Sequence, residues 1–460
     1  MTQKDVEGIQ KRFEHSPGLS GFQLASLGRY VKPETPPLLD DERKWTDAEW
    51  IRWAVEAYLP YRTWQVSNHY SDAAVEDTVK RFSQWYLAQY AAIHKDADLS
   101  MVHFLGKALS EETGTSAVII LMIDCLPLNF FGLLDRALLN TGFASHALEN
   151  RFAPLPTVTA CTKPEIISGN WNVDGKDYER LLKQRAAAES GRSNAIYVSN
   201  LKSLASSTLS LDAPVLLLNF VDCDELLHTD MEARHMTHEE QLQFTFNRLA
   251  EDLAAVAATW EGSREDVTVL VLTDHGACRV LNEERTTLES SVINKIFSDE
   301  RHRYAFIEES SAKDVPDNLW ELGHAFNRPF VSETGVFFIP SGHNTVKCPS
   351  GARGGYVHGG ATPEEVIVPA ARYKLVKAPW KGPSVRFLDL AMDAATGKSR
   401  FYIQRLVSVK LEIQNPNSAE MVVQRAGVTA PETDLKGCDM PKIQGGGVGV
   451  LRLDCYFKRQ

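Results

Sequence analysis

The sequence has few cysteines and no long apolar run, and these two absences narrow the class of protein. Its seven cysteines are scattered over 460 residues, with no CxxC pair, which is typical of reduced thiols in a cytosolic protein. No apolar run approaches the roughly 18 residues that cross a membrane. The N-terminus also lacks the apolar segment of a secretory signal. We therefore expect a soluble, cytoplasmic protein that does not enter the membrane.

The chain also has no net positive charge. The chain has 49 Lys and Arg against 60 Asp and Glu, a net charge of −11, which disfavours broad nucleic-acid or anionic-membrane binding and leaves room only for a local basic patch. Internal repeats and low-complexity tracts are absent as well. The hydrophobic share of 43% is that of a globular protein, and the length predicts two or three domains.

Residues 1–112 have a mainly helical pattern. Trp50, Trp53, Val79 and Phe82 recur at helical spacings, which predicts amphipathic helices. We expect these aromatic side chains to pack against the next domain rather than to form a base-stacking surface.

From 113 to 378 short apolar runs alternate with helical stretches, and this predicts an α/β fold, a parallel sheet with helices on both faces. The predicted strands are 117–123, 195–198, 214–221, 267–273, 335–339 and 365–368. Predicted helices include 130–140 and a helix that begins at Thr237, with Glu240 completing a capping box. Residues 379–460 read as a small β domain, which we expect to be a sandwich. In it the glycines at 445–447 and 449 favour a hairpin or a bulge over a phosphate loop, because no helix follows.

Three acidic residues stand where apolar runs end. Asp124, Asp224 and Asp274 follow such runs, His228 lies four positions after Asp224, and His275 follows Asp274 directly. Burying carboxylates is costly without partners, and ligands of open α/β sheets bind beyond the carboxyl ends of the strands. Carboxylates and imidazoles converging at one sheet edge predict a metal site.

A late histidine and a threonine-rich segment complete the candidate site. His358 lies in the segment Gly354-Gly-Tyr-Val-His-Gly-Gly360, whose glycines permit close backbone approach. The nucleophile candidate lies in Pro156-Thr-Val-Thr-Ala-Cys-Thr-Lys-Pro-Glu-Ile-Ile-Ser-Gly169. A threonine hydroxyl is a poor nucleophile until a metal activates it. Two ions about 4 Å apart can hold both the attacking and the leaving oxygen of a phosphoryl displacement.

The order of these motifs resembles the alkaline phosphatase superfamily. Within it, the chain is similar to the PglZ family of phage-defence (BREX) systems, most clearly over 356–369 and in all over about 116–375. Longer PglZ proteins carry more sequence upstream, so the chain is expected to be a short member or a C-terminal portion. The family also implies other defence-system proteins as partners.

The resemblance implies two divalent metal ions, most simply zinc, with manganese as the alternative. It also implies Thr159 as the nucleophile, rather than Thr157 or Thr162, from its place relative to Gly169. One ion would be held by Asp224, His228 and His358, and the other by Asp124, Asp274, His275 and the Thr159 oxygen.

Hydrolysis of a phosphate ester is the reaction that these motifs favour. Cys161-Thr-Lys-Pro164 does not match the Cys/Ser-x-Pro-x-Arg motif of sulfatases, and 169–215 is too short for the lid domain of a phosphomutase. The resemblance favours a phosphodiester, such as that of a nucleotide or nucleic acid, over a monoester. Two alternatives stay open: a scaffold subunit of a multi-protein defence complex that keeps a metal site for stability, and a signalling nuclease.

The remaining polar residues near these motifs receive simpler interpretations. We expect Lys163 and Arg353 to be solvated surface charges rather than phosphate ligands, and His235 and His343 to be incidental. The cysteines near the motifs are expected to be packing residues; they are Cys125, Cys223 and Cys278. Three further acidic residues are expected to support the site or to be exposed; they are Asp222, Glu225 and Asp230.

Overall fold

The computed structural model describes most of the chain up to residue 376 and the strands beyond it. The described residues are 2–13, 26–39, 44–112, 116–171, 173, 175, 177–229, 231, 237–287, 296–297, 303–310, 315, 317–346 and 355–376, together with the backbone of the strands between 384 and 459. Spatial proximity groups Lys32–Leu139 and Phe143–Lys377 into one compact unit, and Met1–Val31, Asn140–Gly142 and Ala378–Gln460 into a second. Each unit is described by itself.

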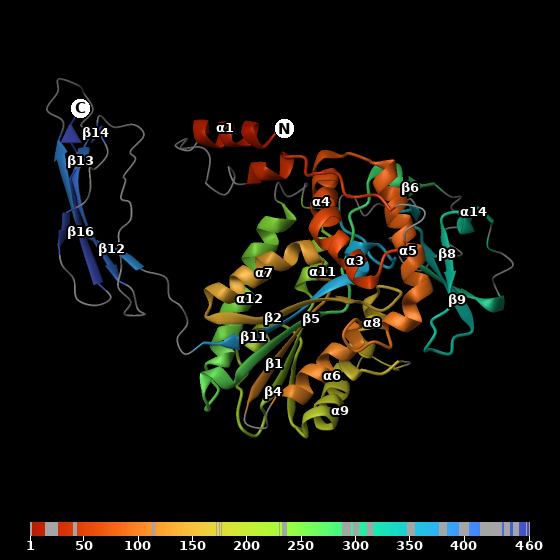
Figure 1. Cartoon of the computed structure of the whole chain (residues 1–460). Coiled ribbons are helices and arrows are strands. Elements are labelled where there is room, and N and C mark those ends of the chain that lie inside the picture. The colour runs from red at the N-terminus through yellow and green to blue at the C-terminus, as the bar shows by residue number, and fades with distance from the viewer. Residues whose placement is uncertain are drawn as a thin grey trace. The chain divides into compact units, whose positions relative to one another are not determined.

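A six-stranded sheet forms the centre of the larger unit (Figure 1), in the order β2-β11-β5-β1-β4-β3. Strands β1 (Ala117–Ile123), β3 (Ala195–Val198), β4 (Val215–Phe220) and β5 (Val267–Thr273) are parallel. Strand β11 (Ile367–Leu375) runs antiparallel between β5 and β2 (Phe143–Phe152). The α/β prediction is confirmed, but the sheet is mixed rather than wholly parallel.

Helices cover both faces of this sheet, because alternate strand residues point to opposite sides. On one face α6 (Met101–Glu111), α8 (Thr159–Ser168) and α9 (Tyr178–Ser190) pack on Val118, Ile120 and Met122. On the other face α7 (Leu128–Asn140) and α12 (His238–Ala257) pack on Ile119 and Leu121. The two layers of helices hold the strand ends at fixed spacing.

The N-terminal helices of the larger unit are α3 (Asp47–Arg52), the π-helix η2 (Trp53–Tyr58), α4 (Leu59–Asn68) and α5 (Ala73–Ile93). Thr46 caps α3 in a capping box with Glu49. Trp50 and Trp53 are buried with Phe152 and Ile367 of the sheet, so these aromatics pack as predicted. None of the helices among the described residues has the length and apolarity needed to cross a membrane.

Two sequence predictions about strands need correction. The strand predicted at 335–339 is β9 (Gly335–Pro340), which belongs to a separate antiparallel sheet with β7 (Ala305–Glu308) and β8 (Gly323–Phe326). The strand predicted at 365–368 begins later, because a capping box between Thr362 and Glu365 starts the short helix α15 (Pro363–Val366). Strand β2 carried no sequence prediction, since its 143–152 segment is polar and its side chains are only partly buried.

Short elements complete this unit. They are α10 (Leu201–Leu204), α11 (Asp222–Leu227), α14 (Asp317–Trp320), η4 (Arg264–Asp266), η5 (Asn282–Glu284), and the pair β6 (Arg285–Thr286) and β10 (Thr345–Val346).

The second unit contains α1 (Gln3–Phe13), the 3-10 helix η1 (Ser26–Tyr30) and the C-terminal strands. An antiparallel sheet has the order β12 (Ser384–Ala394), β13 (Gln404–Gln414), β16 (Val450–Tyr456), β15 (Lys442–Gln444), and β14 (Leu435–Lys436) pairs with β17 (Lys458–Arg459). The C-terminal region is therefore β-structured, as predicted, while its packing as a sandwich stays a prediction. The glycines at 445–447 and 449 lie outside the described residues.

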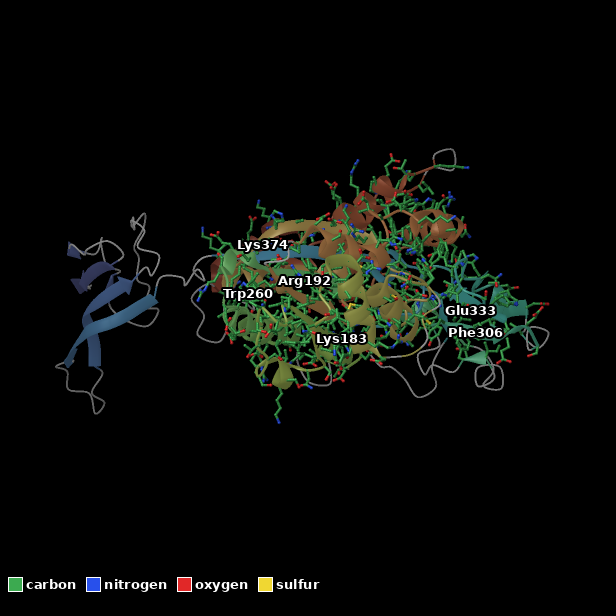
Figure 2. The ribbon with its side chains drawn as sticks, turned by 90° about the horizontal axis from the view of Figure 1, so that it is seen from below. Lys183, Arg192, Trp260, Phe306, Glu333 and Lys374 are labelled. Carbon is green, nitrogen blue, oxygen red and sulfur yellow. The ribbon has the colours of Figure 1, made fainter. Side chains whose placement is uncertain are left out.

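The edge of the central sheet where β1 and β5 begin is closed by polar contacts. Arg192, which follows α9, donates to the Ser116 hydroxyl at 3.1 Å, and Lys374 of β11 donates to Thr268 of β5 at 2.5 Å. Figure 2 labels Arg192 and Lys374. The carboxyl ends of the parallel strands form the opposite edge, where the candidate residues lie.

Candidate active site

Three adjacent strands deliver the three aspartates to one place. Asp124 directly follows β1, Asp274 directly follows β5, and Asp224 lies in α11 just after β4. Since β1 is paired with β4 on one side and β5 on the other, the parallel strands bring these carboxylates to a single edge, as the sequence predicts.

The first group of candidate ligands consists of Asp224, His228 and His358. The Nε2 atoms of the two histidines are 3.1 Å apart, and Asp224 Oδ1 lies 2.9 Å from His228 Nε2 and 3.4 Å from His358 Nε2. Each Nδ1 is 2.8 Å from a backbone carbonyl, that of Tyr356 for His228 and that of Thr157 for His358. These acceptors assign the ring hydrogens to Nδ1. Both Nε2 lone pairs therefore face the same point, an arrangement that suits a cation.

The second group consists of Asp124, Asp274 and His275, with Thr159 beside it. The Nε2 atom of His275 lies 3.6 Å from Asp274 Oδ2 and 4.0 Å from Asp124 Oδ1. Its Nδ1 again faces a carbonyl, that of Gly276 at 3.1 Å. The His275 and His358 rings stack with centroids 4.2 Å apart, so the two groups are neighbours.

Two carboxylate oxygens in these groups lack a hydrogen-bond donor. They are Asp224 Oδ1 and Asp274 Oδ2, both buried. Since a buried polar atom without a partner is costly, and since oxygen and imidazole donors suit Zn²⁺ or Mn²⁺, the residues present fit a pair of divalent cations. The clusters Asp224–His228–His358 and Asp124–Asp274–His275 each place one donor atom per residue within 4.8 Å of the others.

The protonation states of His275 and Asp224 suit cation binding, whereas that of Asp124 is less favourable. Burial, followed by the neighbouring His358, lowers the pKa of His275 to about 3, so the imidazole is neutral. Burial opposes ionisation of Asp224, but its contacts with His228 and His358 outweigh burial and hold the pKa of this carboxyl well below its usual range. Burial and mutual repulsion raise the pKa of Asp124. A bound cation would offset that repulsion.

Thr159 is the first residue of α8, and its hydroxyl points at the second group. The hydroxyl donates to Asp124 Oδ1 at 2.9 Å and lies 3.3 Å from His275 Nε2. Val158, the residue before the helix, makes no side-chain cap, and the Cys161 amide donates to the Val158 carbonyl at 2.9 Å, so the amides of Thr159 and Ala160 are the ones that an anion at the helix N-terminus would meet. Thr162 instead donates to the Val158 carbonyl, and Thr157 donates to the carbonyl of Gly360.

Glycines at two motif positions have identifiable steric roles. Gly276 lies against the backbone of Glu364, so that a Cβ there would be 2.1 Å from the Glu364 carbonyl oxygen. Gly169 ends α8 with φ +71° and leaves room for the guanidinium of Arg185. Gly276 therefore permits close packing of the backbone beside the site, whereas Gly169 permits Arg185 to pack at the opposite end of α8.

The prediction for Lys163 is wrong. Its side chain is buried, and Nζ donates to Asp124 Oδ2 at 2.6 Å and to Asn219 Oδ1 at 3.0 Å, with Asp274 Oδ2 at 3.9 Å. Lys163 lies one helical turn after Thr159, on the same side of α8, and this spacing places it beside the nucleophile candidate without indicating that it is buried. Arg353, the other basic candidate, lies outside the described residues.

The prediction that His343 is incidental is also wrong. This buried imidazole contacts Glu76 Oε2 through Nδ1 at 2.6 Å and Glu364 Oε1 through Nε2 at 2.9 Å. Tyr58 also donates to Glu364, and Arg62 forms a bidentate pair with Glu284. The network ties α4 and α5 to Glu364, whose backbone packs on Gly276. Glu76, Glu284 and His343 also meet the spacing of a metal cluster, but Arg62 and the His343 ring already supply cationic partners.

The other neighbours of the site follow the sequence interpretation where they are described. Cys125, Cys223 and Cys278 are buried free thiols, and burial raises the pKa of each, so packing is their role. Asp222 and Glu225 line a polar cavity of about 380 Å³ beside α11. Asp230 and His235 lie outside the described residues.

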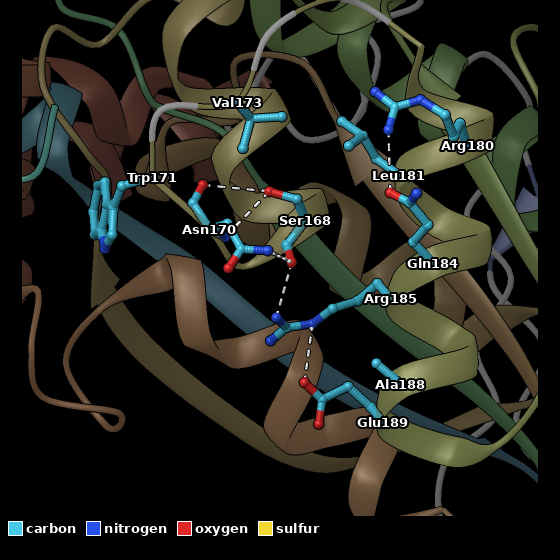
Figure 3. A pocket seen from close by; sticks show the side chains of 10 residues that line it. All are labelled: Ser168, Asn170, Trp171, Val173, Arg180, Leu181, Gln184, Arg185, Ala188 and Glu189. Atoms are coloured by element: carbon cyan, nitrogen blue, oxygen red, sulfur yellow. Dashed lines mark hydrogen bonds and ion pairs between the residues drawn. The ribbon is translucent and has the colours of Figure 1, made fainter. Parts of the chain in front are cut away.

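A larger cavity lies at the other end of α8. It has a volume of about 640 Å³ and is lined by Trp171, Arg180 and Arg185 among others. In Figure 3 Arg185 points at the backbone of Ser168, and its N–H donates to that carbonyl at 2.9 Å. Because Ser168 ends the helix that Thr159 begins, this cavity is separate from the candidate active site.

Comparison with solved structures finds murine and human ectonucleotide pyrophosphatase/phosphodiesterase 5. The murine protein is 11% identical, with coverage of 56% of this chain and 88% of that chain and a TM-score of 0.39. The human protein is 9% identical, with 56% and 87% coverage and a TM-score of 0.39. These likenesses are too distant to bear on the chemistry of the site.

Sequence comparison gives a more specific result. No curated protein matches the chain, but residues 150–373 match a family described as the BREX system PglZ alkaline phosphatase-like domain. This range contains Thr159, Asp224, His228, Asp274, His275 and His358. The resemblance predicted from the motifs is thereby confirmed over residues 150–373, which are similar to the PglZ alkaline phosphatase-like domain.

Proposed function

We propose that this chain is a metal-dependent phosphoesterase that hydrolyses phosphodiesters, with Thr159 as its nucleophile. The observation that carries the proposal is the presence of two clusters of carboxylate and imidazole donors, Asp224–His228–His358 and Asp124–Asp274–His275, with the Thr159 hydroxyl in contact with Asp124 and His275 of the second cluster. The PglZ match supports a phosphoesterase and a role beside other proteins of a phage-defence system. The preference for a diester comes from the family resemblance.

Asp224, His228 and His358 would hold one divalent ion, and Asp124, Asp274, His275 and the Thr159 oxygen would hold the other. Bound ions supply Lewis-acid stabilisation of the charge on the attacking and leaving oxygens. Zinc fits the mixed imidazole and carboxylate donors, and manganese is the alternative.

The chain's own residues account for the remaining steps. Asp124 Oδ1 accepts the hydrogen of the Thr159 hydroxyl and orients its oxygen. The N-terminal N–H groups of α8 bind the phosphoryl oxygens. Thr159 Oγ1 then gives its proton to Asp124 and forms a bond to phosphorus as the bond to the departing alkoxide breaks, and the alkoxide takes a proton from water. The hydroxide left by that water next attacks the phosphorus of the threonyl intermediate, which releases a phosphate monoester, and the Thr159 oxygen takes its proton back from Asp124.

The test is hydrolysis of bis-p-nitrophenyl phosphate and of p-nitrophenyl phosphate, with Zn²⁺, Mn²⁺ or a chelator. Thr159→Ala is expected to lower kcat by roughly 10³-fold or more while the protein still binds metal. Thr162→Ala is the matched control, because Thr162 lies in the same helix and donates only to the Val158 carbonyl. Full activity of Thr159→Ala would remove Thr159 from the mechanism, and greater activity on the monoester would refute the diester preference.

A non-catalytic scaffold is the alternative function. Metal bound by a folded site stabilises the protein whether or not catalysis occurs. The Trp-rich region is a weaker docking surface than its composition indicates, because Trp50 and Trp53 are buried. Variants of Thr159 that lose hydrolysis and keep partner binding would favour the enzyme, whereas an inactive wild-type protein that binds both metal and partner would favour the scaffold.

A further inference from the structure

Lys163 brings a fixed positive charge into the candidate active site. It is 1% exposed and extends from α8 towards the ends of three adjacent strands. Its ammonium meets one side-chain oxygen from each of them, those of Asp124 after β1, Asn219 in β4 and Asp274 after β5, at 2.6, 3.0 and 3.9 Å. An enclosure of oxygen atoms from carboxylates and an amide is also what a hard metal ion such as Mg²⁺ prefers.

The two oxygens of Asp124 face different partners. Oδ1 accepts the Thr159 hydroxyl at 2.9 Å, and Oδ2 accepts the Lys163 ammonium at 2.6 Å. The carboxylates of Asp124 and Asp274 lie 2.6 and 3.9 Å from this ammonium. Lys163 therefore fixes the rotation of the carboxylate that orients the nucleophile.

We propose that Lys163 is the built-in third cation of this site, an ammonium at an oxygen-lined position that would otherwise suit a hard metal ion, and that it positions Asp124 for Thr159. The part of this inference that concerns catalysis rests on the proposed phosphoesterase function. The part that concerns the stability of the metal-free protein does not depend on that function. Lys163 is a positioning residue, because its contacts are with Asp124 and Asn219 rather than with the Thr159 oxygen.

Two substitutions separate the charge from the volume of the side chain. Lys163→Ala removes both and leaves a space that a small cation can enter, whereas Lys163→Met keeps most of the volume and removes only the charge. Lys183→Ala is the control, since Lys183 is an exposed lysine on α9 paired with Glu179. Thermal unfolding of all four proteins is measured with chelator alone, with methylammonium or ethylammonium added to the chelator, and with millimolar Mg²⁺ without chelator.

We expect both Lys163 variants to unfold at a lower temperature than the wild-type protein. Methylammonium, ethylammonium or Mg²⁺ should restore stability to Lys163→Ala and not to Lys163→Met. In the metal-loaded proteins, kcat should fall about 10- to 100-fold with KM little changed, and the same cations should restore part of it in the alanine variant alone.

Three results would overturn the proposal. The first is a Lys163→Met variant with wild-type stability and kcat, a comparison that also serves if the alanine variant does not fold. The second is a folded Lys163→Ala variant that no small cation stabilises. The third is equal rescue of both variants, since that would be a general salt effect. Rescue of stability in a protein without hydrolytic activity would uphold the cation role and reject the phosphoesterase function instead.

Discussion

Metal binding by the two ligand groups should raise the thermal stability of the larger unit by a measurable amount. Asp124, Asp224 and Asp274 crowd the same strand ends, and Lys163 is the one lysine or arginine among the described residues that forms an ion pair with any of them, at 2.6 Å from Asp124 and 3.9 Å from Asp274. Two like charges 4 Å apart repel by about 4 kcal/mol at an effective dielectric constant of 20. Ions that bind there stabilise the folded state alone, because the unfolded chain has no such site.

The size of the effect follows from linkage. An ion present at 100 times its Kd contributes about 2.7 kcal/mol. The larger unit contains about 340 residues, for which the entropy of unfolding is about 0.7 kcal/mol/K. Each ion should therefore raise Tm by about 4 °C, and both together by about 8 °C.

Differential scanning fluorimetry after chelation and stepwise addition of Zn²⁺ or Mn²⁺ measures this shift. His228→Ala should remove the contribution of one ion and leave the other, because His228 belongs only to the first group. His146→Ala, which changes an exposed histidine away from both groups, should behave as the wild-type protein does. No saturable shift with either metal, from a folded and fully chelated protein, would refute the metal site itself.

Two further predictions concern how the N-terminal helices are joined to the site. The acidic groups Glu76, Glu364 and Glu284 outweigh burial and the nearby Arg62 to raise the pKa of His343 to about 10. Because the ordinary pKa of histidine is 6.5, protonated His343 contributes fully to the free energy of unfolding below pH 6.5, and this contribution is lost as the pH rises through 10. Urea unfolding at pH 7 and pH 10 should show a fall in the free energy of unfolding, and the fall should be smaller in His343→Gln. Residues 32–377 produced alone should fold and bind metal, whereas residues 113–378 should not, as circular dichroism and metal titration would show; a folded 113–378 fragment would contradict this expectation.

The sequence predicts the central fold well because strong local patterns coincide with burial. The runs before Asp124, Asp224 and Asp274 are wholly buried strands, β1, β4 and β5, and parallel pairing alone brings their ends together. The antiparallel direction of β11 was not predictable from its composition. A strand flanked by neighbours on both sides has the same apolar pattern in either direction.

The buried charges were harder to predict than the ligands. Lysine is rarely buried unless it is paired, so a surface position is the better expectation for Lys163 from sequence alone. Its partners Asp124 and Asn219 are 39 and 56 positions away in the chain. The same holds for His343, whose partner Glu76 is 267 positions away. Tertiary partners at such separations leave no local pattern.

These buried contacts also change how the N-terminal helices should be understood. The sequence pattern predicts 1–112 as a region before the core, yet η2, α4 and α5 supply Tyr58, Arg62 and Glu76 to the network that holds Glu364. Glu364 packs its backbone on Gly276, and the amide of Gly276 donates to the Glu365 carbonyl at 2.9 Å. Because His275 precedes Gly276 and His358 precedes α15, these contacts connect the helices to one histidine of each ligand group. The helices therefore belong to the framework that sets the spacing of the proposed metal ions.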